Sequence, residues 1–254
     1  PYFAEEPIRI HGLTDIGHGG MVALDLDGDG RAKLVTDALS GMFVAHALLV
    51  VIGQTEEGLR VVHGQVISYD NRPSRILSWI HGGQAHLVTV DRSGMVRDYL
   101  GLPPVQQHQF QAAGSVLSAA IGDVDADGRD EMVVLTEQGI HRYDLESGAF
   151  EHTYTTASEY FSDVALAQLD ADPALEIILS GQAGWVLDGA TSAVEWTSIA
   201  GAGEQVVSGR FGDSGAPQWV TADWQSFSVF APWKFHWGHS TPKPIGAVGS
   251  VKQG

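Results

Sequence analysis

Short apolar stretches alternate with acidic turns along most of the chain. Met21–Leu24 precedes the turn Asp25–Gly30, and the apolar pair Leu34 and Val35 follows it. The same order recurs later in Val116–Ile121, Asp123–Gly128 and Met132–Leu135. Short apolar runs bounded by Asp and Gly are typical of β-strands joined by tight turns. The pattern therefore predicts a strand, an acidic turn and a second strand.

This frame repeats at a nearly constant interval. Further copies, two of them fainter, run over residues 76–88, 164–179 and 206–220. Five equivalent positions are separated by 53, 45, 45 and 42 residues, namely Val35, Val88, Val133, Ile178 and Val220. An interval near 45 residues is typical of the blades of β-propellers.

The second half of each repeat predicts a hairpin. Trp185–Leu187 and Ala193–Val194 flank the turn Asp188–Ser192, and Ile140–Asp144 and Ala149–Tyr154 flank a turn that contains Gly148. One repeat thus comprises four short strands. We predict an all-β fold, a β-propeller of four-stranded antiparallel blades, about five of them complete, with partial units at both ends. The predicted units are 19–72, 73–113, 114–157, 158–201 and 202–241, with a partial unit at 242–254 and another that includes Ile8–Ile10.

The two acidic turns and their flanking strands resemble the calcium-bearing repeats of the FG-GAP and VCBS class of β-propellers. The resemblance covers most of the chain as a degenerate pattern and is specific at Asp25–Gly30 and Asp123–Gly128. This class is seen in integrin α-subunit heads, in bacterial surface and secreted proteins, and in some polysaccharide lyases. The resemblance implies Ca²⁺ as the cofactor, export to a calcium-rich place, and a role in adhesion.

The chemistry of the acidic turns fits this cation. Calcium takes six to eight oxygen ligands, and side chains at positions 1, 3 and 5 of a tight loop point inward together while Gly at position 6 permits the sharp turn. The third unit predicts the best site. Its ligands are Asp123, Asp125, Asp127, the carbonyl of Arg129 and, where the family usually has Asp, Glu131.

Two further loops keep part of this set. The first unit offers Asp25, Asp27, Asp29 and the carbonyl of Arg31, but Lys33 at position 9 binds no cation and neutralises carboxylates instead, so binding should be weaker. The fourth unit predicts another weak site, because Pro173 replaces the glycine; its set is Gln168, Asp170, Asp172 and Glu176. The fifth unit has Arg210 at position 1 and Ser214 at position 5, and we expect no calcium there.

Two other interpretations compete with a propeller calcium site. An EF-hand requires a bidentate Glu at position 12 and flanking helices, but Thr36 and Val134 stand there inside strand-like runs. The simpler alternative is a set of solvated Asp-Gly turns that hold no metal.

Composition narrows the possible partners. The 254 residues carry 31 Asp and Glu against 14 Lys and Arg, a formal charge of −17, which would repel the phosphates of nucleic acid. The absence of cysteine excludes disulfides, thiolate nucleophiles and Cys-ligated zinc. No apolar run is long enough for a membrane span, and the best candidate, Met42–Val51, contains His46.

Aromatic residues concentrate towards the end of the chain. Trp233 and Trp237 predict a possible ligand surface for sugar rings or a protein partner. Trp219 and Trp196 are interpreted as core residues, since Trp219 aligns with Ile177 and Trp196 ends a predicted hairpin.

We therefore expect a non-catalytic, calcium-stabilised binding or adhesion module with a protein or polysaccharide ligand, located outside the cell, on its surface or in the periplasm. The alternative is a propeller-fold polysaccharide lyase or glycoside hydrolase, or the non-catalytic part of one. The end of the chain resembles the first strand of a sixth unit, which could close a blade with Ile8–Ile10. A blade made only of these two pieces would lack its middle strands and leave edges open, which favours a segment of a seven- or eight-bladed propeller over closure by the two termini.

Overall fold

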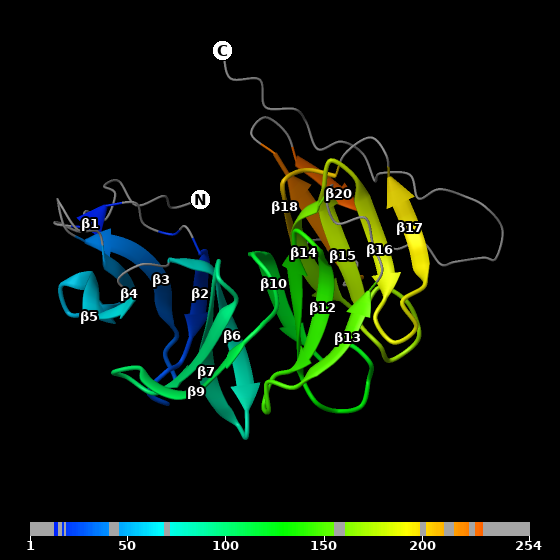
Figure 1. Ribbon diagram of the computed structural model, residues 1–254. Coiled ribbons are helices and arrows are strands. Elements are labelled where there is room, and N and C mark those ends of the chain that lie inside the picture. The colour runs from blue at the N-terminus through cyan, green and yellow to red at the C-terminus, as the bar shows by residue number, and fades with distance from the viewer. Residues whose placement is uncertain are drawn as a thin grey trace, which may run out of the picture. The chain divides into compact units, whose positions relative to one another are not determined.

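The chain forms β-strands and turns throughout the part that the structure describes. This computed structural model describes residues 13–14, 17, 19–40, 46–68, 72–154, 161–198, 202–210, 216–223 and 227–230. All its regular elements are strands, which confirms the all-β prediction. They form five antiparallel sheets that follow one another along the chain, here numbered blades 1 to 5 (Figure 1). Two compact units contain them, Pro1–Gln111 and Ala112–Gly254.

The first unit holds blades 1 and 2. Blade 1 has the order β1-β3-β4-β5, with β2 also paired to β3, so that its inner strand is in two parts. Its strands are β1 (Leu13–Thr14), β2 (Met21–Leu24), β3 (Lys33–Ser40), β4 (His46–Thr55) and β5 (Gly58–Ser68). Blade 2 is a four-stranded meander of β6 (Pro73–His81), β7 (Gln84–Asp91), β8 (Met95–Leu100) and β9 (Val105–Gln111).

The second unit holds blades 3, 4 and 5. Blade 3 consists of β10 (Val116–Gly122), β11 (Glu131–Thr136), β12 (Gly139–Asp144) and β13 (Phe150–Tyr154). Blade 4 consists of β14 (Phe161–Ala167), β15 (Glu176–Gly181), β16 (Gly184–Asp188) and β17 (Val194–Ser198). Blade 5 has, among the described residues, β18 (Gln205–Gly209), β19 (Gln218–Ala222) and β20 (Phe227–Phe230).

The outer hairpins of blades 1 to 4 share one irregularity. In each, the register of the last strand against its neighbour shifts by one residue, so the last strand carries a β-bulge. The extra residues stand at equivalent positions, namely Val62, Gln107, Glu151 and Glu195. A bulge bends the strand and changes the direction of the extra side chain.

Apolar side chains fill the space between successive blades of a unit. One buried cluster joins Val133 and Leu135 of blade 3 to Ile177 and Leu179 of blade 4. A second joins blades 4 and 5, where the rings of Trp196 and Trp219 lie 5.9 Å apart. These two tryptophans are buried, so their predicted place in the core is confirmed. A third cluster joins blades 1 and 2.

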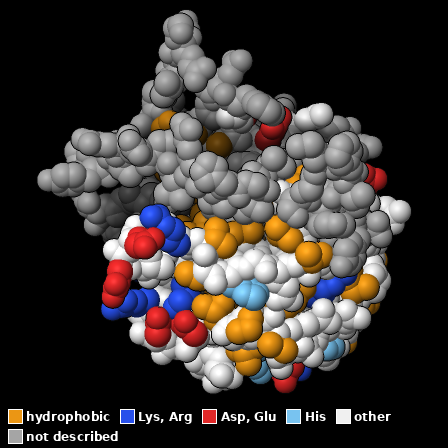
Figure 2. Space-filling view, turned by 90° about the vertical axis from the view of Figure 1, so that its left-hand side faces the viewer, with side chains coloured by type: hydrophobic (Ala, Val, Ile, Leu, Met, Phe, Trp, Pro, Cys, Tyr) orange, Lys and Arg blue, Asp and Glu red, His pale blue; other side chains and the backbone are white. Residues whose placement is uncertain are grey.

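Successive antiparallel sheets, four-stranded in blades 2 to 4 and packed face to face within each unit, are the blades of a β-propeller, as the sequence predicts. Apolar side chains also reach the surface, where Val61, Val62 and Val66 of β5 are 39–43% exposed. Figure 2 shows hydrophobic side chains among polar and charged ones on the face that it draws. No helix of the described residues is long and apolar enough to cross a bilayer. Trp233 and Trp237, and the partial units at Ile8–Ile10 and 242–254, lie outside the described residues.

Candidate metal centres

The acidic loop of blade 3 joins β10 to β11 and is shaped by its own backbone. The N–H of Gly128 donates to Asp123 Oδ2 at 3.1 Å, and the N–H of Arg129 donates to Asp127 Oδ1 at 2.9 Å. Gly128 has a φ of 89°, a left-handed conformation that glycine adopts without steric cost. This fold of the loop directs successive aspartates towards one point.

Four predicted ligands of blade 3 come together. Asp123, Asp125, Asp127 and Glu131 each place a carboxylate oxygen within 4.8 Å of the others. Glu131 is 1% exposed, and its Oε2 accepts the N–H of Val124 at 2.7 Å. Burial raises the pKa of Glu131 to about 7, although the bond from Val124 opposes the shift. The carbonyl of Arg129 stays a prediction as a fifth ligand.

The charges around this cluster are only partly balanced. Arg142 Nη2 lies 3.0 Å from Asp125 Oδ2, and Arg129 Nη2 lies 2.8 Å from Asp127 Oδ2. The hydrogen bond from Arg129 lowers the pKa of Asp127. Asp123 Oδ1, in contrast, is buried and has no hydrogen-bond donor. A buried carboxylate oxygen without a donor is costly, and a cation would stabilise it.

In blade 1 a lysine lies among the carboxylates. Asp25, Asp27 and Asp29 converge as their counterparts in blade 3 do. Lys33 Nζ donates to Asp27 Oδ1, lies 2.9 Å from Asp29 Oδ1 and 4.0 Å from Asp25 Oδ1, and donates to the carbonyl of Arg31 at 3.2 Å. Burial alone would lower the pKa of Lys33, but its bonds to Asp27 and Asp29 outweigh burial and raise it. The ammonium therefore takes the position that a cation would occupy.

Blade 4 gathers a different set from the one expected. Asp170 and Glu176 converge, but their third partner is Glu195 of β17, and one carboxylate oxygen of each lies within 4.8 Å of the others. Asp172 is outside this set, and its Oδ1 accepts the N–H of Ala174 at 2.9 Å. The side-chain amide of Gln168 donates to the carbonyl of Asp172.

Sequence reasoning missed Glu195, although a signal was present. Glu195 and Glu151 precede Trp196 and His152 at the same point of the outer hairpin in consecutive repeats. Both are the extra residues of their bulges. A repeated acid at a bulge therefore marks a side chain turned towards the acidic loop of its own blade.

Blade 4 has the strongest unbalanced negative charge of the three loops. Burial raises the pKa of Glu176 to about 7. Burial, and then the charges of Asp170 and Asp188, raise the pKa of Glu195 to about 7, and burial also raises the pKa of Asp172. Glu176 is fully buried and its Oε1 has no hydrogen-bond partner.

The donor sets of blades 3 and 4 fit calcium. They consist of carboxylate oxygens only, which suit hard cations such as Ca²⁺, Mg²⁺ and Mn²⁺. Each set includes one buried oxygen without a donor, on Asp123 and on Glu176. Blade 1 has no such oxygen among the described residues, because Lys33 already supplies the donors.

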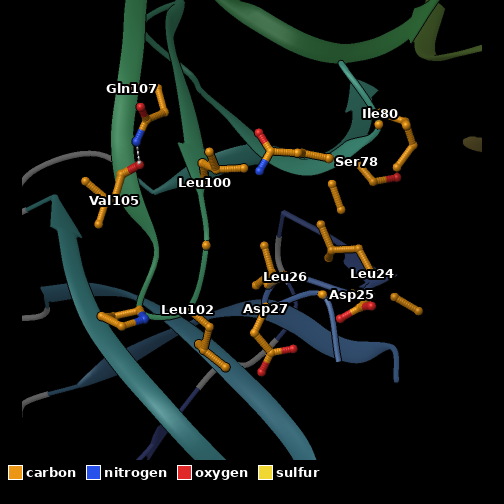
Figure 3. Close-up of a pocket in the computed structure, with 17 residues that line it drawn as sticks. Leu24, Asp25, Leu26, Asp27, Ser78, Ile80, Leu100, Leu102, Val105 and Gln107 are labelled. Atoms are coloured by element: carbon orange, nitrogen blue, oxygen red, sulfur yellow. Dashed lines mark hydrogen bonds between the residues drawn. The ribbon is translucent and has the colours of Figure 1, made fainter. Parts of the chain in front are cut away.

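An open pocket of about 970 Å³ lies in the first unit, beside the acidic loop of blade 1 (Figure 3). Leu24 and Leu26 line it together with Asp25 and Asp27, and the hairpins of blade 2 form the other wall. Gln107, the bulge residue of β9, also lines it and donates to the carbonyl of Val105 at 2.9 Å. The lining thus combines apolar side chains with the carboxylates and amides of several polar residues.

Comparisons with known proteins show the fold alone. No protein-family model matches the chain, and no curated protein sequence matches it. The crystal structure of BBS1N in complex with ARL6DN, soaked with mercury, is similar at a TM-score of 0.55 and 13% identity, over 93% of this chain and 84% of that chain. The same complex soaked with lead gives a TM-score of 0.53 and 12% identity over 86% and 79%.

The V. cholerae biofilm matrix protein Bap1 is also similar, with a TM-score of 0.52 and 16% identity over 83% of this chain. This chain spans 37% of the length of Bap1. These structures support the five-bladed β-propeller. Since no family model matches, the FG-GAP and VCBS resemblance stays a prediction.

Proposed function

We propose that this protein is a non-catalytic, calcium-stabilised β-propeller module that binds a protein or polysaccharide ligand. The observation that carries the calcium proposal is the pair of orphaned oxygens, Asp123 Oδ1 and Glu176 Oε1, each buried inside a converging set of carboxylates. Two independent blades share this feature at equivalent loops. A bound cation would satisfy these oxygens and cancel the repulsion around them.

Ligand binding is supported by the fold of the neighbours and by the shape of the first unit. BBS1N was crystallised with a protein partner, ARL6DN, and Bap1 is a biofilm matrix protein. The open pocket beside Asp25 and Asp27 offers a place where a ligand can bury apolar surface. We propose an extracellular, cell-surface or periplasmic location, where weak calcium sites with few carboxylates are filled.

The alternative class, a lyase or hydrolase of polysaccharides, needs an acid free to transfer protons in a sugar-sized groove. Asp163, a buried acid of blade 4, accepts the hydroxyl of Ser118 at 2.5 Å and the N–H of Val206 at 2.9 Å. These bonds join the inner strands of blades 3, 4 and 5, which favours a structural role for this acid.

Thermal unfolding tests the calcium proposal. The chain should melt at a higher temperature in calcium than in chelator. Each bound ion should add about 2.7 kcal/mol to the free energy of unfolding when free calcium exceeds Kd by about 100-fold. Asp123→Asn should reduce this difference. Glu146→Gln, which removes the same charge from an exposed site in blade 3, should leave it unchanged. Equal melting temperatures in calcium and chelator would remove calcium from the proposal.

Incubation with polysaccharides separates the two function classes. The proposed module should bind a polysaccharide or a protein without releasing reducing ends. Release of reducing ends by the purified chain would favour the enzyme instead.

A further inference from the structure

Blades 3 and 4 differ at one position that decides their charge balance. In blade 3, Arg142 of β12 lies between two acids, with Nη2 3.0 Å from Asp125 Oδ2 and Nε 3.1 Å from Glu151 Oε2. The equivalent residue of blade 4 is Val186, because Arg142 pairs with Val133 just as Val186 pairs with Ile178. Blade 4 thus keeps the bulge glutamate and lacks the arginine that neutralises it.

The bulge places Glu195 at the acidic loop. Trp196 pairs with Val186 and Val194 pairs with Leu187, so Glu195 is the extra residue between two regular pairs. Its side chain therefore need not follow the alternation of side chains between the two faces of the sheet. Its carboxylate meets those of Asp170 and Glu176 within 4.8 Å. Glu195 thus reaches the cluster from β17, the outermost strand of the blade, whereas the loop joins β14 to β15.

No positively charged side chain in the described part of blade 4 balances these three carboxylates. No Lys or Arg of the described residues is found within 4.0 Å of Asp170, Glu176 or Glu195 as an ion-pair partner. Glu176 Oε2 accepts the N–H of Leu169, whereas Oε1 is buried and has no donor. A fully buried carboxylate that has an unpaired oxygen and lies close to two other carboxylates is stable only beside a cation or a proton.

The loop of blade 4 also explains why a ligand from another strand is needed. In blade 3 the N–H of Gly128 closes the loop onto Asp123, the ligand at position 1. In blade 4 the corresponding residue is Pro173, which has no N–H, and position 1 is Gln168, whose amide is engaged with the carbonyl of Asp172. Position 1 therefore offers no carboxylate, and Asp172 at position 5 lies outside the cluster.

We propose that blade 4 binds Ca²⁺ between its acidic loop and its outer strand, with Asp170, Glu176 and the bulge residue Glu195 as carboxylate ligands. This inference rests on the calcium part of the proposed function and adds a ligand that lies outside the loop. Ligands on opposite sides of Ca²⁺ are about 4.6–5.2 Å apart, twice the Ca–O distance, so carboxylate oxygens that all lie within 4.8 Å of one another can share one such ion.

Calcium titration of the chelator-treated full chain by isothermal calorimetry tests the inference. The parent and the E195Q variant are compared, and E151Q serves as the matched control because Glu151 is the equivalent bulge residue of blade 3. We expect E195Q to bind one ion fewer than the parent, or to bind it at least tenfold more weakly, and E151Q to keep the number of ions of the parent. An E195Q variant with the same number of ions at unchanged affinity overturns the inference.

A second variant keeps the inference testable if E195Q does not fold. E195K places an ammonium beside Asp170 and Glu176, as Lys33 does beside its aspartates in blade 1. It should also bind one ion fewer than the parent, yet melt higher than the parent in chelator. A lower melting temperature of E195K in chelator counts against a cation position at Glu195.

The D123N variant distinguishes this inference from the calcium proposal as a whole. If D123N loses an ion and E195Q does not, calcium binds blade 3 and the inference for blade 4 is wrong. If the parent binds no calcium, both are wrong.

Discussion

Removal of one hydroxyl group should destabilise the second unit measurably. Tyr154, the last residue of β13, is 1% exposed, and its hydroxyl donates to the carbonyl of Gly189 in blade 4 at 2.7 Å. Tyr154→Phe keeps the ring in the core but leaves that carbonyl without this donor. A buried hydrogen bond contributes about 1 kcal/mol net, and a buried polar atom left unpaired costs about 1–3 kcal/mol. We therefore expect the free energy of unfolding to fall by about 1–2 kcal/mol.

Urea and thermal denaturation followed by tryptophan fluorescence measure this loss. Of the seven tryptophans, Trp79 alone lies in residues 1–111, so the signal reports mainly on the second unit. At about 2–4 °C per kcal/mol for a chain of this size, Tm should fall by about 2–8 °C. Thr153→Ala, at the exposed neighbouring position, should change stability by less than about 0.5 kcal/mol.

A Tyr154→Phe variant as stable as the parent would refute the interpretation that this hydroxyl ties blades 3 and 4 together. An equal loss in Thr153→Ala would do the same, because it would point to a general sensitivity of β13.

Two further predictions concern the acidic loops. Lys33→Asp should add one bound Ca²⁺ per chain in calorimetry, because it replaces the ammonium beside Asp27 and Asp29 with an oxygen ligand. An unchanged number of ions would contradict the assigned position of Lys33. In chelator, Tm should fall as the pH rises from about 4.5 to about 7. Burial raises the folded-state pKa of Glu131, Glu176 and Glu195 from 4.5 to about 7. Between these two pH values the folded chain binds more protons than the unfolded chain, so the free energy of unfolding falls as the pH rises. With calcium this fall should shrink or reverse, because the metal binds the ionised carboxylates. A pH series of melting curves measures both, and a Tm in chelator that rises over this range would contradict the prediction.

Local sequence patterns are sufficient to predict the strands and the acidic loops. Alternation of apolar runs with Asp-Gly turns depends on neighbouring residues, so the set Asp123, Asp125, Asp127 and Glu131 was predictable from spacing alone. The position of Lys33 was also predictable, since position 9 of a loop that closes on itself faces the same point as its aspartates.

The bulge ligand was not predictable in this way. A strand with regular register alternates its side chains between two faces, and a single extra residue changes the face of everything beyond it. Whether Glu195 faces the loop therefore depends on pairing with β16, which the composition of β17 does not specify. The role of Arg142 depends likewise on its place opposite both Asp125 and Glu151, which are distant in sequence from each other.

In blade 1 the positive charge that balances the acidic loop belongs to the chain itself. The ammonium of Lys33 is attached to β3, so its effective concentration beside Asp27 and Asp29 is set by the length of the side chain and is independent of the surrounding solution. A chelator removes an ion but leaves an amino group in place. The charge balance of the first acidic loop is thus independent of ion supply, and on the calcium proposal a shortage of calcium would act on the loops of the second unit.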